Sequence, residues 1–370
     1  MENKTILQEL FNRKNKIDSG NVFDILVNFH KQIKEAIEIG EQISFDDLTL
    51  ENVSKTKNIA ILGMGGSAIG GDLIKSYLEA RKFAGQITIV RNYELPSYID
   101  DSYLILAVSY SGNTEETLCS VKLALEITKN IICISTGGEL LDIARSNNLN
   151  HILMPGGYQP RLALGYSFFV QLYTLIKLNL LTSVKDDKNF EQSIFTEIKE
   201  LIQLIEANAE YYSMENEANA PYQIAMSLYK KQIMIYSSDN LLNTINYRWR
   251  GQFQENSKNL AYGGFLPEMN HNEINSFKFP EVVVENLSFL FLVDKEYHQR
   301  VLKRFEVFED ILKEANYNIL VIQSHADGLL ARMFDLIYLG DWISFYLAML
   351  NNIDPTPIPL INKLKSELSK

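Results

Sequence analysis

The chain has 370 residues, a net charge of −11 at pH 7, 46% hydrophobic residues and 22% charged residues. This composition is typical of a soluble globular protein with one or two domains, and the negative charge excludes general electrostatic attraction to nucleic acid or anionic membrane. Two cysteines, Cys119 and Cys133, lack metal-ligand spacing and indicate a reducing cytoplasm. The longest apolar run, 287–293, is shorter than the about 20 residues of a membrane span.

The first 55 residues are predicted to be helical, with a break at 18–21, and the first ten form an amphipathic pattern unlike a signal peptide. Strand and helix signals then alternate. Five apolar runs without polar alternation predict a parallel sheet that is buried on both faces. These runs are 58–62, 86–90, 103–108, 131–134 and 151–154, and the Pro/Gly-rich segment 155–160 follows them.

Two long helices are predicted next, over 164–181 and 189–210. A second alternating series follows them, so the chain is predicted to be an α/β protein with two doubly wound halves, each a mainly parallel sheet flanked by helices. Its strands are expected at 232–236, 282–284 with 289–293, and 318–322, and its helices at 241–258, 296–316, 326–350 and 357–369. The predicted divisions are N-terminal helices (1–55), a first domain (56–160), connecting helices (161–215) and a second domain with a C-terminal helix (216–370).

A hydroxyl-rich loop follows the third apolar run, at Ser109-Tyr-Ser-Gly-Asn-Thr114. A helical pattern begins directly after it, and the first N–H groups of a helix have no partner within the helix. The helix dipole adds partial positive charge at that end, and hydroxyl groups add donors without adding net charge. Ser109, Ser111 and Thr114 are therefore predicted to bind the phosphate of a small molecule.

A glycine-rich loop, 63–71, follows the first strand. Gly63, Gly65 and Ala68 match the G-x-G-x-x-A pattern of dinucleotide-binding folds. The acid expected after the second strand is missing until Glu94, although Arg91 suits a nicotinamide dinucleotide phosphate. A plain strand-to-helix turn is a further alternative. The hydroxyl-rich loop favours a sugar phosphate instead, and the residues predicted to approach it are Gly65, Gly66 and Ser67.

Together the two loops resemble the sugar isomerase (SIS) domain, so two SIS-type domains are expected. Further motifs at 248–258, 267–274, 354–358 and 361–365 resemble the bifunctional phosphoglucose/phosphomannose isomerase family, from about residue 55 to the end. Ser257 stands where that family is expected to carry alanine. The resemblance implies interconversion of glucose 6-phosphate and mannose 6-phosphate with fructose 6-phosphate.

Such a reaction moves a proton between C1 and C2 through a cis-enediol, after the sugar ring has opened. It needs a carboxylate that acts as base and acid, a ring-opening group and a donor for the enediolate oxygen. The resemblance assigns proton transfer to Glu255 and ring opening to His271, with His271 supplied by the neighbouring subunit of a homodimer. From the residues alone, Glu255 also fits a solvated helix position, His271 a structural histidine, and His325 is the second candidate for ring opening.

The resemblance also favours Lys365 over Lys363 on the last helix, and Arg161 beside C1 and C2 of the sugar. Because these two lysines project about 200° apart on a helix, only one faces a given site. The sequence holds no zinc-type motif, and neither a metal nor an organic cofactor is expected. The alternatives are a non-enzymatic SIS-type regulator that senses a sugar phosphate, an aminosugar-phosphate SIS enzyme and a nicotinamide enzyme.

Overall fold

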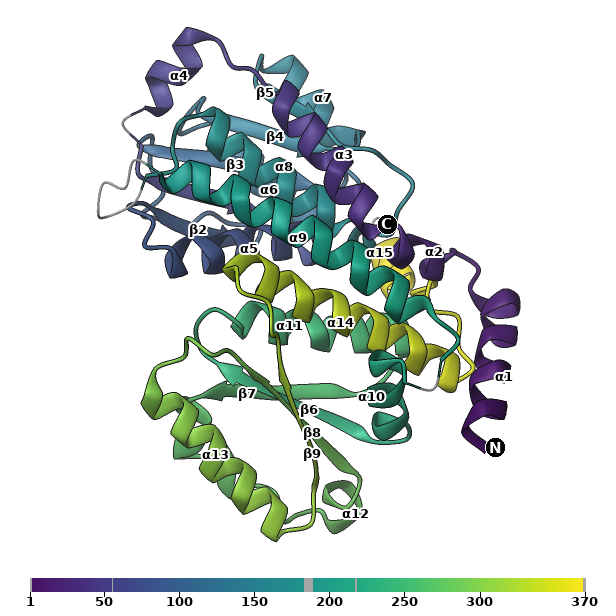
Figure 1. The fold of residues 1–370 in the computed structure, drawn as a ribbon. Coiled ribbons are helices and arrows are strands. Elements are labelled where there is room, and N and C mark those ends of the chain that lie inside the picture. Colours follow the sequence, from purple (N-terminus) through teal and green to yellow (C-terminus); the bar gives the residue numbers. More distant parts are fainter. Residues whose placement is uncertain (1, 55, 183–188, 217, 369–370) are drawn as a thin grey trace. The chain divides into compact units, whose positions relative to one another are not determined.

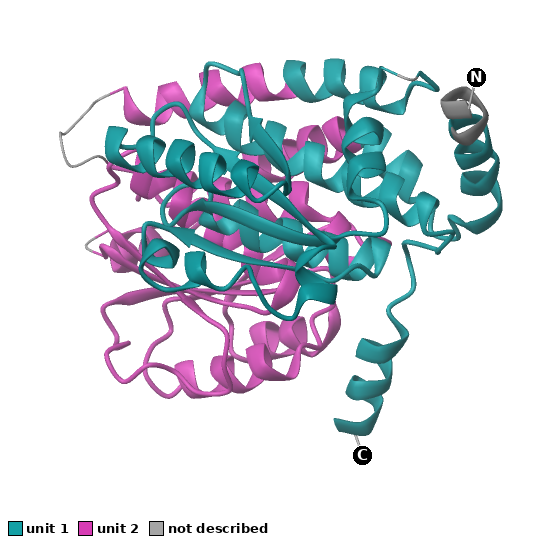
Figure 2. Ribbon diagram, turned by 90° about the horizontal axis from the view of Figure 1, so that it is seen from below, with its two compact units in different colours: residues 1–28, 203–370 teal, residues 29–202 magenta. Residues whose placement is uncertain are grey.

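The computed structural model describes residues 2–54, 56–182, 189–216 and 218–368. The chain divides into two compact units, coloured in Figure 2. Unit 2 is residues 29–202, and unit 1 combines residues 1–28 with residues 203–370. The N-terminal 28 residues therefore belong to the same unit as the C-terminal half.

Unit 2 is built on a five-stranded parallel sheet with the strand order β2-β1-β3-β4-β5 (Figure 1). β1 pairs with both β2 and β3. The winding of the sheet therefore changes direction between β1 and β3, which is the position where open α/β sheets bind ligands. The strands are β1 (Asn58–Leu62), β2 (Gln86–Val90), β3 (Tyr103–Ser109), β4 (Ile131–Ser135) and β5 (Asn150–Leu153).

The five strands predicted for this half are confirmed. Every residue of β3 and β4 is buried, because unbroken Ile, Leu and Val runs suit a sheet covered on both faces. α3 and α5 both pack against α8. The helices are α3 (Phe29–Gln42), α4 (Asp47–Val53), α5 (Gly65–Ala80), α6 (Glu115–Ala124), α7 (Gly138–Ser146), the short η1 (Pro160–Leu162) and α8 (Leu164–Lys177); α9 (Phe190–Ser213) runs across the division at residue 202.

Unit 1 contains a four-stranded parallel sheet with the order β7-β6-β8-β9. The predicted α/β class with two parallel sheets is thus confirmed. The strands are β6 (Gln232–Ser238), β7 (Ala261–Leu266), β8 (Leu287–Val293) and β9 (Asn318–Gln323). The helices are α1 (Glu2–Ile17), α2 (Val22–Val27), α10 (Ala220–Leu228), α11 (Asn243–Gln252), η2 (Phe253–Ser257), η3 (Glu268–His271), η4 (Glu273–Asn275), α12 (Glu281–Val284), α13 (Gln299–Glu314), α14 (Leu329–Leu350) and α15 (Pro359–Leu368).

Several details of the second half differ from the sequence prediction. Val282–Val284, predicted as a strand, forms part of the short helix α12, and the edge strand β7 was not predicted. The predicted helix over 241–258 also divides, because α11 ends at Gln252 and a single π-helical turn, η2, follows it. This division bears directly on the candidate site, since η2 carries Glu255.

α14 is the central helix of unit 1 and packs against α10 and α11. By length and hydropathy alone it is able to cross a membrane, but 89% of its most apolar window is buried inside the protein. This burial is typical of the core helix of a soluble protein. The sequence prediction placed a helix at 326–350, but it considered only unbroken apolar runs and did not identify this helix as long and apolar enough for a membrane span.

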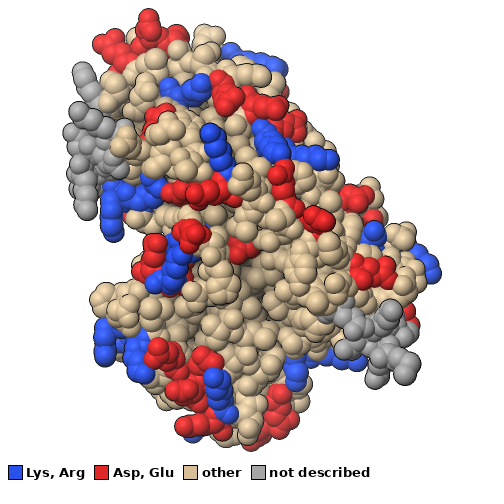
Figure 3. Space-filling model, in the orientation of Figure 1, with Lys and Arg blue, Asp and Glu red and all other residues tan. Residues whose placement is uncertain are grey.

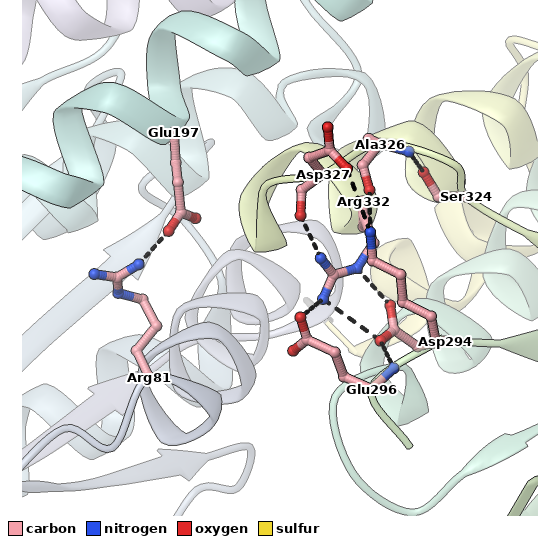
Figure 4. Close-up of polar contacts among 9 residues, drawn as sticks. Arg81, Glu197, Asp294, Glu296, Ser324, Ala326, Asp327 and Arg332 are labelled. Atoms are coloured by element: carbon pink, nitrogen blue, oxygen red, sulfur yellow. Dashed lines mark hydrogen bonds and ion pairs between the residues drawn. The ribbon is translucent and has the colours of Figure 1, made fainter.

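Each unit contains a side-chain ion pair that is buried or partly buried (Figure 4). In unit 1 the Arg332 guanidinium, whose side chain is 1% exposed, bonds Asp294 at 2.8 Å and Glu296 at 2.9 Å. In unit 2, Arg81 pairs with Glu197. Removing one partner from the Arg332–Asp294 pair would leave a buried charge uncompensated, which is strongly destabilising. These ion pairs fix structure and belong to none of the predicted site segments.

Candidate active site

The predicted phosphate loop lies between the carboxyl end of β3 and the first turn of α6. Thr114 is the N-cap residue of α6, and its side chain makes no capping hydrogen bond to the helix. The Ser109 hydroxyl lies 2.9 Å from the Thr114 hydroxyl. Ser109 is fully buried, whereas Ser111 is exposed. The first N–H groups of α6 thus lie beside paired hydroxyls, an arrangement able to bind an anion.

The same loop is braced by the start of α7. Gly112 has φ +70°, and a Cβ added there would lie 1.7 Å from the Gly137 carbonyl oxygen, so only glycine fits. The Leu140 N–H donates to the Gly112 carbonyl at 2.9 Å, and the Glu139 N–H donates to the Asn113 side chain at 3.0 Å. The Asn113 side chain therefore caps α7, and these two hydrogen bonds fix the hydroxyl-rich loop to the start of that helix.

The glycine-rich loop begins α5 at Gly65, directly after β1. The Tyr110 N–H donates to the Ser67 hydroxyl at 2.9 Å, and Ser67 is buried. This hydrogen bond joins the glycine-rich loop to the hydroxyl-rich loop at the point where the sheet changes its winding direction. Contact of Ser67 and Gly65 with a sugar stays a prediction.

Arg161 lies in η1 and is 4% exposed. A Cβ on Gly66 would lie 2.7 Å from the Pro160 carbonyl carbon, so the glycine lets the first loop approach the Arg161 segment. From α3, the buried Gln32 amide donates to the Leu162 carbonyl at 2.9 Å and accepts from the Gly165 N–H at 2.7 Å. Unit 2 therefore brings the two loops and the Arg161 segment together, and sequence reasoning missed Gln32, which holds the backbone on the C-terminal side of Arg161.

Glu255 lies in the π-helical turn η2 and is partly buried. Single π turns within helices occur frequently at functional sites. The helix before the turn is fixed by Arg248, which donates two hydrogen bonds to Asp341 of α14 at 2.8 and 3.0 Å. Gln252 donates to the same carboxylate at 2.7 Å. Burial raises the pKa of Asp341, and Arg248 opposes that rise.

His271 ends η3 and is exposed. The loop continues into η4, whose Glu273 carboxylate accepts a hydrogen bond from the buried Tyr236 hydroxyl of β6. Burial and this carboxylate raise the pKa of Tyr236 above its usual range, so the phenol stays a donor. Tyr236 and Glu273 were not predicted as support for His271, although Glu273 lies within the 267–274 motif.

Lys363 and Lys365 both lie on α15, where every residue is exposed. Burial therefore does not distinguish Lys363 from Lys365, and the preference for Lys365 stays a prediction. In unit 1, Glu255, His271 and Lys365 belong to three separate segments.

Among the described residues, no group of three or more His, Cys, Asp and Glu side chains is arranged to hold a metal ion. Arg91, the residue that suited a dinucleotide phosphate, instead donates to the Asp72 carboxylate. One cavity of about 240 Å³ in unit 2 contains none of the predicted site residues; it is lined by Glu41, Tyr173, Ile176, Lys177, Asn179, Glu191 and Phe195.

Comparison with known proteins identifies the family. The family model for the bacterial phospho-glucose isomerase C-terminal SIS domain matches residues 217–368. The bifunctional phosphoglucose/phosphomannose isomerase of Caldicellulosiruptor bescii is 37% identical over 351 residues, which are 94% of this chain and 99% of that protein. The chain belongs to the bifunctional phosphoglucose/phosphomannose isomerase family. It is accordingly an isomerase of sugar phosphates, and the predicted family is confirmed.

Two other similarities place the isomerase family in context. The D-glucosamine-6-phosphate 4-epimerase of Sulfolobus acidocaldarius is 33% identical over 251 residues, which are 68% of this chain and 72% of that protein. The crystal structure of a hypothetical protein from Thermus thermophilus superposes with a TM-score of 0.72 at 13% identity, covering 99% of this chain and 94% of that chain. The second similarity supports the fold alone.

Proposed function

We propose that this protein interconverts glucose 6-phosphate and mannose 6-phosphate with fructose 6-phosphate, without a metal or an organic cofactor. The observation that carries the proposal is the pair of loops at the β1/β3 position. There an uncapped α6 N-terminus and the Ser109–Thr114 hydroxyl pair adjoin the glycine-rich loop, which itself lies against the Pro160–Arg161 backbone. Neutral donors and a helix N-terminus suit a phosphate dianion, and an arginine suits a developing enediolate.

In the proposed mechanism, His271 assists ring opening and Glu255 then takes the proton from C2 of the open-chain aldose. The electron pair of that C–H bond forms the enediolate, whose oxygen Arg161 stabilises, and Lys365 assists the ring-opening or oxyanion step. Glu255 returns the proton to C1 while the proton of the C2 hydroxyl passes to the C1 oxygen, which gives the ketose. One carboxylate serves both aldoses if the enediol rotates about the C2–C3 bond.

The proposal includes a homodimer in which each subunit supplies His271 to its neighbour, and a cytoplasmic location. The family's resemblance supports the dimer, and a core position for α14 together with two free cysteines supports the location. The proposed binding partner is the sugar phosphate, and neither nucleic acid nor a membrane is expected to bind.

The first experiment incubates the purified protein with fructose 6-phosphate and EDTA and separates the products. Both glucose 6-phosphate and mannose 6-phosphate are expected, and Glu255→Gln should abolish the formation of both. Glu314→Gln, at an exposed carboxylate of α13 outside the predicted site segments, is the matched control. Formation of glucose 6-phosphate alone would show that the protein does not act on mannose 6-phosphate.

A parallel incubation with glucosamine 6-phosphate tests the chemistry of the 4-epimerase relative. The expected result is no change at C4 of this aminosugar. Conversion at C4, with no isomerisation of fructose 6-phosphate, would replace the proposed reaction. No product from either compound, with a thermal shift on adding fructose 6-phosphate, would favour a regulator that senses the sugar phosphate.

A further inference from the structure

Lys258 closes the turn that carries Glu255, in an uncommon backbone conformation. Its φ and ψ are 55° and 30°, in the left-handed region, which residues with a Cβ adopt uncommonly. The preceding residues, Phe253–Ser257, form the π-helical turn η2. Two uncommon conformations, the π-helical turn and the left-handed Lys258, therefore follow each other in the segment around Glu255.

The Lys258 ammonium contacts backbone carbonyl groups. Its Nζ lies 2.7 Å from the Glu255 carbonyl oxygen and 3.4 Å from that of Asn256. It also lies 3.0 Å from the Asp354 carbonyl oxygen and 3.4 Å from that of Pro355. An ammonium group has three protons and accepts no hydrogen bond. Four carbonyl oxygens from two distant segments thus surround one cation.

The buried side of the same turn is held by other side chains. The Asn256 amide donates to the Ser344 hydroxyl at 3.0 Å, the Ser257 hydroxyl donates to the Phe253 carbonyl at 2.8 Å, and the Asn351 amide donates to the Ser257 carbonyl at 3.0 Å. These hydrogen bonds fix Asn256 and Ser257. The Glu255 carbonyl is held instead by Lys258, which is itself largely exposed.

We propose that Lys258 is a positioning residue for proton transfer. By joining the Glu255 carbonyl to the Asp354–Pro355 turn, its ammonium fixes the backbone from which the Glu255 carboxylate reaches the substrate. This proposal rests on the role of Glu255 in the proposed function. Lys258 does not touch the reacting carbons in this scheme, so its loss lowers the rate of the chemical step and leaves phosphate binding, a property of unit 2, unchanged.

The group that fits among these carbonyls is compact and carries one charge. Carbonyl oxygens also surround dehydrated potassium ions, and ammonium is a similar compact cation. Arginine is planar and presents its donors in a fixed fork, so it does not reproduce contacts that come from several directions. Lys258→Ala should therefore leave a set of carbonyl oxygens that a small monovalent cation is able to occupy.

The test compares Lys258→Met, Lys258→Arg and Lys258→Ala with the wild type, using fructose 6-phosphate. We expect kcat to fall by roughly tenfold or more in each variant while KM stays within about twofold. Lys303→Met is the matched control, because Lys303 is an exposed lysine of α13 that pairs with Glu306. Unchanged kcat in Lys258→Met would overturn the proposal.

Cation rescue separates positioning from a merely structural role. Ammonium or potassium chloride should raise kcat of Lys258→Ala severalfold over tetramethylammonium chloride at equal ionic strength, and should leave the wild type unchanged. No rescue, or a rise in KM that matches the fall in kcat, would overturn the proposal. Glu255→Gln is assayed in parallel. If this variant stays active, the proposed role of Glu255 is wrong, and the role of Lys258 is wrong with it. If Glu255→Gln is inactive but Lys258→Met is fully active, only the role of Lys258 is rejected.

Discussion

At the scale of single residues, hydroxyl groups are expected to set the affinity for phosphate. Ser109→Ala removes the partner of the Thr114 hydroxyl at a fully buried position. A hydrogen bond of this kind contributes about 0.5–1.5 kcal/mol, so KM for fructose 6-phosphate should rise roughly two- to tenfold. The rate constant kcat should change little, because the phosphate is remote from C1 and C2. Steady-state kinetics measure both constants.

Ser146→Ala is the control for Ser109→Ala, because Ser146 is exposed and lies at the end of α7 in the same unit. Its kinetic constants should match those of the wild type. A fall in kcat at constant KM in Ser109→Ala would place Ser109 at the reacting carbons instead of at the phosphate.

Asp335 of α14 makes stability depend on pH. Its carboxylate accepts from the Asn208 amide at 2.8 Å and from the Ser324 hydroxyl at 2.6 Å, yet burial raises its pKa above 3.8. An acid whose pKa is raised in the folded state contributes stability below its unfolded pKa and loses that contribution as pH rises through the folded value. Ionised Asp335 therefore lowers the free energy of unfolding at neutral pH.

Asp335→Asn removes this titration while its amide accepts from Asn208 and donates to Ser324. The free energy of unfolding of the variant relative to the wild type should therefore increase as pH rises from 3.8. Urea unfolding at several pH values between about 4 and 7 measures the difference. A difference that is constant with pH, or that falls as pH rises, would contradict the assignment.

At the scale of elements, β6 is expected to hold the His271 segment through one hydroxyl group. The Tyr236 ring stacks on Phe289 with centroids 6.2 Å apart, while its hydroxyl donates to Glu273 of η4. Tyr236→Phe keeps the ring and removes the donor. Because a hydrogen bond to a charged group contributes about 1.5–3 kcal/mol, we expect a lower free energy of unfolding and a lower kcat, measured by urea unfolding and product formation.

Tyr262→Phe provides the comparison for Tyr236→Phe, since Tyr262 is half exposed on the neighbouring strand β7. It should leave stability and kcat unchanged. If Tyr236→Phe lowers stability but leaves kcat intact, the hydroxyl supports the fold without positioning His271.

The elements that the sequence predicted well are those whose local pattern and burial agree. β3 and β4 are unbroken apolar runs and were found. β7 was missed because Gly263 and Gly264 lower its strand propensity, and pairing with β6 along its whole length compensates. Val282–Val284 has high strand propensity, but Pro280 precedes the segment and Asn286 bonds back to the Val282 carbonyl, so it forms one helical turn.

In the candidate site too, local sequence patterns were predictable and long-range contacts were not. The two loops of unit 2 were predictable because each consists of consecutive residues with a known physical function. The hydrogen bond that joins the loops, from the Tyr110 N–H to Ser67, and the support of the Arg161 segment by Gln32 depend on residues far apart in the sequence. In unit 1, Glu255 and His271 came from family resemblance. Lys258 was visible within the same motif, but its contacts with Asp354 and Pro355 involve residues almost one hundred positions away, which no local pattern reveals.

At the scale of the whole molecule, an acidic protein is expected to bind an anion. Acidic and basic side chains are intermingled on the face shown in Figure 3, and the net charge is −11. Long-range attraction therefore does not favour the proposed phosphate binding, which depends instead on local N–H and hydroxyl donors. Affinity should accordingly depend only weakly on salt compared with a site built from cationic side chains.

The proposed homodimer predicts that two inactive variants restore each other. If His271 acts in the neighbouring subunit, a hybrid of one Glu255→Gln chain and one His271→Ala chain contains one site with both residues intact and one site lacking both. Random pairing of equal amounts makes about half of the dimers hybrids, so the mixture should show about a quarter of wild-type activity. If each chain supplied both residues to its own site, every site would lack one of them and the mixture would stay inactive. Co-expression of the two variants with different affinity tags, followed by purification through both tags, raises the expected activity to about half and makes the two outcomes easy to distinguish.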